Sequence, residues 1–208
     1  MPGSGKCGCD VRAATRCCQY LYTTRLLGLT YSKGQIHAVE GADDADWAGC
    51  ADTRESTTGS VVISRGAAVM WSSHRQRNLA LSSAESEYVA INHCARDIVW
   101  FRRLSKFIGN AQRDPTRILE DSSSALRWCE DYPNWSKTRH VDIKYRKINE
   151  LIRRREVEPV KVHTNSQPAD ILTKSVSHAI LANLRPLILG HNPDTHLTLG
   201  APAASAAA

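Results

Sequence analysis

The order of the expected strands and helices predicts an α/β fold: a mixed five-stranded sheet with helices packed on it. Three strand-like stretches come first, and a short turn at Arg65-Gly66 joins the second and third, which indicates an antiparallel hairpin. Two more strands then alternate with helices, which is typical of units whose strands run parallel. The chain has 208 residues, 42% of them hydrophobic, enough for one domain with its own core and flanking tails.

The expected strands follow from alternation, β-branched content and bounding turns. Residues 35–40 alternate apolar and polar side chains and run into an acidic stretch at 41–49, so the acids are expected where this strand ends. Residues 57–59 are expected to form the turn before the second strand. The remaining strands are expected at 60–64, 67–73, 116–120 and 158–163.

The clearest helix is expected at 82–108, where apolar side chains recur every three or four residues and Gly109-Asn110 ends the pattern. Shorter helices are expected from Asp121 to about Glu130, over 140–154, and from Ser166, where Pro168 falls in the first turn. A further helix is expected at 17–29, within a lead-in of residues 1–34. Residues 176–208 are expected to hold a C-terminal helix and a disordered tail.

Composition limits the classes of protein that this chain can represent. No apolar run approaches the roughly 18 residues of a membrane-spanning helix, and the first residues lack the hydrophobic segment of a secretory signal. We therefore expect a cytoplasmic, intracellular protein. The seven cysteines are scattered without a CxxC pair, which favours free thiols over a zinc site.

The acidic stretch at 41–49 carries three aspartates at the end of the first expected strand. Because side chains alternate along a strand, Asp44 and Asp46 should point to one side and Asp43 to the other. Like charges packed this closely cost stability unless a cation neutralises them. The stretch is therefore either a solvated acidic turn or a divalent-metal site.

Two glutamates at the start of the 82–108 helix differ in their expected roles. Ser82 and Glu85 match a capping box, with Ser82 as N-cap and Glu85 three residues later. Glu87 instead lies on the apolar stripe that faces the sheet, where a charged group is rarely buried without a partner. Its partner is either a lysine or arginine, or a metal ion.

Two more acids lie at element junctions. Asp121 follows the fourth strand and could cap the next helix, although the three serines after it already offer caps. Asp170 falls in the first turn of its helix, where the helix dipole alone favours an acid. Since strand ends meet at one edge of a mixed sheet, Asp44, Glu87, Asp121 and Asp170 together also suit Mg²⁺, which prefers oxygen ligands. This pattern suggests metal-dependent phosphodiester hydrolysis.

Basic residues are concentrated between residues 137 and 155, where eight lysines and arginines face only two acids, Asp142 and Glu150. The net charge of this block equals the +6 of the whole chain. Such a block indicates either a polyanion partner, such as nucleic acid, or a solvated helix face. Its basic residues are Lys137, Arg139, Lys144, Arg146, Lys147, Arg153, Arg154 and Arg155.

Several motifs occur in the order seen in one known family. They are GADDADWAG at 41–49, TRESTTG at 53–59, WSSHRQ at 71–76, LSSAESEYVA at 81–90, TRHVDIKY at 138–145 and QPADILTK at 167–174. Over about residues 20–175 the chain resembles the ribonuclease H domain of copia-type LTR retrotransposon polyproteins. Residues 20–34 resemble the connection that follows the reverse transcriptase in these polyproteins, so the lead-in is assigned to 1–34 and the domain to 35–175.

The resemblance implies a ribonuclease H-like fold and a two-metal endonuclease, a hydrolase that cuts the RNA strand of RNA–DNA hybrids. It implies two Mg²⁺ ions, with Mn²⁺ as a substitute, held by the catalytic acids Asp44, Glu87, Asp121 and Asp170. Asp46 and His163 are candidates for supporting roles. The implied partners are the hybrid, contacted by the basic block, and the reverse transcriptase of the parent polyprotein; no membrane is implied.

The chain departs from the family pattern at two places beside these acids. Ala42-Asp43 stands where the family usually has Tyr-Ser, and Glu120-Asp121-Ser122 stands where it usually has Cys-Asp-Asn. Two other functions therefore stay open. The chain could be a decayed or repurposed retrotransposon fragment that binds nucleic acid without cutting it, or a domain that only packs against a polymerase.

Overall fold

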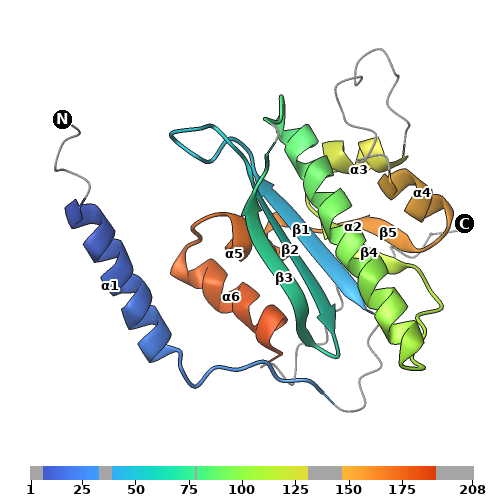
Figure 1. Cartoon of the computed structure of the whole chain (residues 1–208), viewed down its shortest axis with the longest axis horizontal. Helices are drawn as coiled ribbons and strands as arrows, with labels where there is room; N and C mark the ends of the chain where they lie inside the picture. Colours follow the sequence, from blue (N-terminus) through green and yellow to red (C-terminus); the bar gives the residue numbers. More distant parts are fainter. Residues whose placement is uncertain (1–6, 33–38, 78, 131–146, 191–208) are drawn as a thin grey trace, which may run out of the picture.

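The computed structural model describes residues 7–32, 39–77, 79–130 and 147–190, and the expected mixed five-stranded sheet is present in them (Figure 1). The strands lie in the order β3-β2-β1-β4-β5. β1 is antiparallel to β2, and β2 to β3, whereas β1, β4 and β5 run parallel. Their bounds are β1 Glu40–Asp46, β2 Thr57–Ser64, β3 Ala67–Arg75, β4 Thr116–Glu120 and β5 Val157–Lys161.

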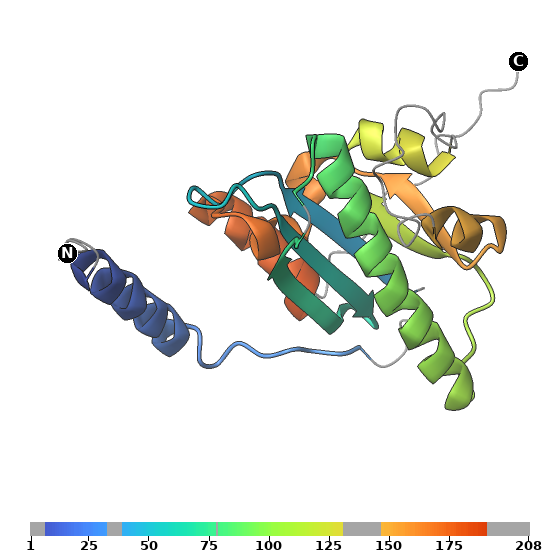
Figure 2. The same ribbon diagram turned by 45° about the horizontal axis from the view of Figure 1, so that its top comes forward.

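Helices cover both faces of the sheet. The long helix α2 packs across one face together with α3 and α4, and the short helices α5 and α6 lie on the other (Figures 1 and 2). The bounds are α1 Cys7–Thr23, α2 Ser83–Phe107, α3 Ser123–Glu130, α4 Lys147–Arg153, α5 Asp170–Thr173 and α6 His178–Leu189, with a 3₁₀ turn at Thr164–Ser166. None of the described helices is long and apolar enough to cross a membrane.

Two separate apolar cores result from the alternation of side chains along the strands. Val62 and Ile118 point toward α2 and meet Ile91, Cys94 and Ile98 there. Their neighbours Val61 and Leu119 point to the opposite side. Because β1, β2 and β4 are buried on both of their faces, the sheet is a central layer between two layers of helices.

Gly41 allows α2 to lie close against the central strand. A Cβ at this position would come within 2.7 Å of both Cys94 Sγ and Ile98 Cδ1. The side chains of α2 therefore fill the space that any larger residue would need. This close approach fixes the distance between β1 and the helix that carries Glu87.

The first two strands differ from their expected bounds. β1 contains most of the acidic stretch instead of ending before it, and the predicted strand residues 35–38 lie outside the described residues. Residues 57–59 were expected in a turn but belong to β2, since Asp46 pairs with Thr57 and Asp44 with Gly59. Gly59 also lies under α5, where a Cβ would meet Thr173 Cγ2 at 2.7 Å. The glycine thus marks a close approach, not a turn.

The lead-in helix is longer than expected, and it starts at Cys7 instead of residue 17. Both views show α1 standing apart from the sheet (Figures 1 and 2). Residues 30–32 return to the domain: Thr30 N–H donates to Leu189 O at 2.8 Å, and the Tyr31 hydroxyl donates to Ala68 O at 2.7 Å. The boundaries proposed at residues 34 and 175 stay predictions, and the tail at 191–208 lies outside the described residues.

Candidate metal centre

Three of the predicted acids converge at one edge of the sheet. Asp44 lies near the end of the central strand β1, Glu87 in the first turns of α2, and Asp121 directly after β4. Each residue has one carboxylate oxygen that lies within 4.8 Å of a carboxylate oxygen of each of the other two. Since β1 and β4 are parallel neighbours, their carboxyl ends bring Asp44 and Asp121 together, and Glu87 approaches from the helix above them.

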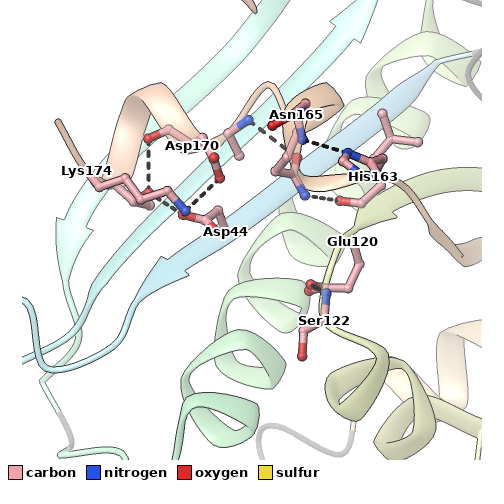
Figure 3. Close-up of polar contacts among 11 residues, drawn as sticks. Asp44, Glu120, Ser122, His163, Asn165, Asp170 and Lys174 are labelled. Atoms are coloured by element: carbon pink, nitrogen blue, oxygen red, sulfur yellow. Dashed lines mark hydrogen bonds and ion pairs between the residues drawn. The ribbon is translucent and has the colours of Figure 1, made fainter. Parts of the chain in front are cut away.

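The fourth acid, Asp170, approaches Asp44 from the opposite face of the sheet (Figure 3). It begins the single turn of α5, and Lys174 at the end of that turn pairs with both acids. Lys174 Nζ lies 2.9 Å from Asp170 Oδ1 and 3.5 Å from Asp44 Oδ2. The Thr173 hydroxyl donates a hydrogen bond to Asp44 Oδ2. Asp44 therefore links the three-acid group to Asp170.

Burial and the charges of neighbouring acids make two acids of this centre, Glu87 and Asp170, hard to ionise. Burial raises the pKa of Glu87 to about 10, and the neighbouring charges of Glu120, Asp44 and Asp121 add to the effect. Glu87 Oε2 is buried and has no hydrogen-bond partner among the described residues. Burial also raises the pKa of Asp170 to about 6, and the ammonium of Lys174 opposes this rise. An unpartnered buried oxygen within a set of oxygen donors fits a hard divalent ion such as Mg²⁺.

A second pair of acids lies on the α2 side of the sheet, beneath this group. Asp43 is fully buried, and neither of its carboxylate oxygens has a hydrogen-bond partner among the described residues. Its pKa is raised well above the usual range, by burial first and then by the charges of Glu120 and Glu87. Burial raises the pKa of Glu120 to about 8, although its Oε1 accepts a hydrogen bond from Ser122 N at 2.5 Å. The sequence predicted which way Asp43 points but not its pairing with Glu120.

Glu85 points away from the metal group, as expected for a capping residue. Its backbone N–H donates to Ser82 Oγ at 3.2 Å, so Ser82 caps α2. Its Oε2 accepts a hydrogen bond from Leu81 N at 2.8 Å. In a standard capping box the donor would be the backbone N–H of the N-cap residue, Ser82, one residue later. Glu85 and Glu87 therefore have different environments even though they are only two residues apart.

The two candidates for supporting roles lie outside the three-acid group. The Asp46 side chain folds back over the turn that follows β1. Its Oδ2 lies so close to Gly49 that a Cβ added at that glycine would collide with it. His163 caps the 3₁₀ turn, and its Nδ1 accepts from Asn165 N at 3.2 Å (Figure 3). Both side chains make local contacts of this kind, and among the described residues neither forms a hydrogen bond or ion pair with the three acids.

Only part of the basic block is described. Lys137, Arg139, Lys144 and Arg146 lie outside the described residues. Within the described part, Lys147 and Arg154 both pair with Glu150 on α4. These two cations lower the pKa of the exposed Glu150 carboxyl. Glu150 thus neutralises part of the positive charge of α4 and of Arg154, the residue that follows it.

Sequence reasoning missed Lys174 as a neighbour of the acids. It lies in the QPADILTK motif, four residues after Asp170, and that spacing places two side chains on the same side of a helical turn. The spacing could have indicated the pair with Asp170. The contact with Asp44 could not be found in this way, because it joins positions far apart in the chain.

Comparison with known proteins gives several relatives, although no family model matches the chain. The chain is 34% identical over 143 residues to the retrovirus-related Pol polyprotein from transposon TNT 1-94 of Nicotiana tabacum, which is 69% of this chain and 11% of that protein. It is 30% identical over 173 residues to the corresponding polyprotein from transposon RE1 of Arabidopsis thaliana, which is 83% of this chain and 12% of that protein. The chain thus spans only about one tenth of these relatives.

A shorter relative and a solved structure complete the comparison. The secreted RxLR effector protein 161 of Plasmopara viticola is 37% identical over 97 residues, which cover 47% of this chain and 68% of that protein. The structure of LC11-RNase H1 in complex with an RNA/DNA hybrid is also similar to this chain. The match covers 65% of this chain and 93% of the LC11-RNase H1 chain, with 16% sequence identity and a TM-score of 0.47.

Proposed function

This chain belongs to the retrovirus-related Pol polyproteins of transposons, as a copia-type ribonuclease H region, and on that premise we propose that it is a metal-dependent endonuclease cutting the RNA strand of RNA–DNA hybrids. The observation that carries the proposal is the meeting of Asp44, Glu87 and Asp121 within 4.8 Å, with Asp170 joined to Asp44 through Lys174. These acids come from four separate elements. A common binding role accounts for their convergence better than four separate structural roles.

In this proposal the four acids are ligands for two Mg²⁺ ions, or for Mn²⁺ in their place. When bound, the ions would supply a hydroxide-like nucleophile and stabilise the charge on the leaving oxygen of the phosphodiester. The carboxylates orient these ions, and the buried setting of Asp44 and Glu87 keeps the ligand positions fixed. Asp46 and His163 act outside this set, through the turns that they order.

The basic block is proposed to hold the sugar–phosphate backbone of the hybrid. Backbone contacts of this type are made by lysine and arginine and carry little sequence information. Lys147, Arg153, Arg154 and Arg155 are its described members. The reverse transcriptase of a parent polyprotein is the second proposed partner, and an intracellular location stays a prediction from the sequence.

A cleavage assay tests the proposed function. A hybrid with one labelled RNA strand and one labelled DNA strand is incubated with the full chain in Mg²⁺, and separately in Mn²⁺. The proposal expects the RNA strand to be cut and the DNA strand to survive, and Asp44→Asn to abolish the cutting. An intact hybrid under both conditions would contradict it.

One observation favours the alternative of a fragment that binds without cutting. Asp43 and Glu120 add two buried acids directly beside the ligands Asp44 and Asp121, where the family usually has uncharged residues. When these two acids are ionised, their negative charge changes how strongly Asp44 and Asp121 hold a cation. Binding of the hybrid without cleavage, in the same assay, is the result that this alternative expects.

A further inference from the structure

Lys174 places an ammonium group between two acids of the candidate metal centre (Figure 3). Its Nζ is 2.9 Å from Asp170 Oδ1 and 3.5 Å from Asp44 Oδ2. The Asp44 side chain is 2% exposed, whereas that of Lys174 is 38% exposed. A cation of the protein itself thus bridges two buried carboxylates, and its side chain has a path to solvent.

The backbone around Lys174 is held in place independently of this ion pair. Its N–H donates to Asp170 O at 3.1 Å, and the chain leaves α5 in an extended conformation at this residue. Thr173 also holds α5 against β1 through its hydrogen bond to Asp44. Since only the flexible four-carbon stem carries the ammonium to the acids, the charge can leave without disturbing α5.

The other side of Asp44 is different. The structure gives neither the Glu87 nor the Asp121 carboxylate an ion pair with a lysine, arginine or histidine in residues 7–32, 39–77, 79–130 and 147–190. Glu87 Oε2 is buried and has no hydrogen-bond partner in the same residues. Among the described residues, the Lys174 ammonium therefore pairs with Asp44 and Asp170, whereas the carboxylates of Glu87 and Asp121 form no ion pair.

We propose that the Lys174 ammonium is a built-in counter-ion that competes with the second divalent ion, so that the two metal positions fill in a fixed order. Asp44, Glu87 and Asp121 would hold the first ion without displacing Lys174. Asp44 and Asp170 would hold the second only after the Lys174 ammonium has moved out toward solvent. This inference rests on the proposed function, because it assumes that these acids bind divalent ions.

The physical reason is electrostatic. An ammonium and a divalent ion that share the same two carboxylates repel each other strongly at separations of a few ångströms in a partly buried site. The ammonium also lowers the negative charge that would attract the second ion. Without bound metal, the same ammonium relieves the repulsion between Asp44 and Asp170. Lys174 therefore stabilises the metal-free protein and weakens binding of the second ion.

Calorimetric titration of the full chain with Mn²⁺, without nucleic acid, tests the competition. The wild type should bind one ion more tightly than the second. Lys174→Met removes the charge and keeps most of the stem, so it should tighten the second site roughly tenfold or more and lower the melting temperature without metal. Lys174→Arg, which keeps the charge, should bind the second ion as weakly as the wild type. Unchanged binding of the second ion by Lys174→Met would overturn the inference.

Labelling of the wild-type protein tests the displacement without any substitution. An amine-acetylating reagent, read by mass spectrometry, should modify Lys174 several-fold faster at Mn²⁺ concentrations that fill both sites. Lys147 is the matched control, since it also pairs with an acid but lies on α4, and its rate should not change. An unchanged rate at Lys174 with two ions bound would overturn the inference.

The results separate the two proposals. If the wild type cuts the hybrid but Lys174 is labelled equally with and without Mn²⁺, the proposed function stands and the counter-ion role is wrong. If the wild type binds no divalent ion at all, both proposals are wrong. Binding of two ions with the predicted effects at Lys174, but without cleavage, supports the counter-ion role and contradicts the proposed activity.

Discussion

Asp43 and Glu120 are buried neighbours on adjacent parallel strands, and the charge of Glu120 adds to the burial that raises the pKa of Asp43. The pairing of Ala42 with Leu119 places the next residues of β1 and β4 beside each other on the α2 face. Both oxygens of Asp43 and Oε2 of Glu120 are buried without a hydrogen-bond partner among the described residues. Such oxygens are costly, so this pair is a source of instability within the core.

The first prediction is that Asp43→Ser stabilises the protein. The substitution removes a buried carboxylate whose oxygens have no hydrogen-bond partner in the described residues, so we expect a gain of about 1–3 kcal/mol at pH 7. Urea unfolding in the absence of divalent ions measures it. Asp52→Ser, at an exposed turn position, is the matched control and should change little. A loss of stability in Asp43→Ser would show that the acid has an unrecognised partner.

The second prediction concerns pH. The pKa of Glu120 is raised to about 8 and that of Glu87 to about 10, both above their usual 4.5. The folded protein therefore binds more protons than the unfolded chain above about pH 4.5, and its stability should fall as pH rises from there toward 8–10. Melting temperatures measured without metal should be higher at about pH 5.5 than at about pH 8.5.

Glu120→Gln provides the control for this pH effect. The variant removes one of the titrating groups, so its melting temperature should depend less steeply on pH than that of the wild type. A wild-type protein whose stability rises over the same range would contradict the raised pKa values.

The third prediction concerns metal binding. Mg²⁺ binds the ionised acids, so it should release protons and raise the melting temperature, with the release largest below the pKa of Glu87. Titrations in two buffers of different ionisation enthalpy measure the protons released. Asp44→Asn should lose most of the effect, whereas Glu85→Gln should keep it. Equal melting temperatures with and without excess Mg²⁺ would argue against a metal centre.

The fourth prediction separates the two glutamates of α2 by activity. Glu87→Gln and Asp44→Asn each remove a ligand charge worth several kcal/mol in the transition state, so cleavage of the hybrid should fall at least about 100-fold. Glu85→Gln should stay close to the wild type and lose only about 1 kcal/mol of stability from its cap. The DNA strand should survive, because only RNA offers a 2′-OH. Loss of activity in Glu85→Gln alone would contradict the assigned helix faces.

The fifth prediction concerns the basic block. Glu150 pairs with Lys147 and Arg154, so Glu150→Gln should free both cations and strengthen binding of the hybrid at low salt. Arg155→Gln should weaken binding and reduce the salt slope by about one for each phosphate that the arginine neutralises. Fluorescence anisotropy over a series of salt concentrations measures both. If binding does not depend on salt, the basic block does not contact phosphates and is a solvated helix face.

Local patterns were enough to predict the sheet and most of its helices. The strand at Thr116–Glu120 and the end of α3 at Glu130 agree with their expected bounds, because alternation and helical spacing are properties of consecutive residues. The opposite directions of Asp43 and Asp44, and the inward position of Glu87, followed from the same rules.

Pairings between distant positions were not predictable in this way. The three residues from Thr57 looked like a turn, but pairing with β1 across the sheet extends β2 through them. Lys174 contacts Asp44 although the two lie near opposite ends of the domain sequence, and Asp43 meets Glu120 only because β4 lies beside β1. In each case the residue that makes the contact belongs to another strand or helix. The periodicity of side chains along the sequence does not identify such a residue.

The bonds made by residues 30–32 also bear on how such a domain could be released from a longer polyprotein by proteolysis. Thr30 is tied to the end of α6 and Tyr31 to the edge strand β3, whereas a Cβ added at Gly28, just before them, would meet no atom within 4 Å. A processing protease that cuts between Thr23 and Gly28 would keep both hydrogen bonds within the released domain. A cut after Ser32 would instead remove Thr30 and Tyr31 with the other fragment, so the C-terminal end of α6 would lose its hydrogen bond to Thr30.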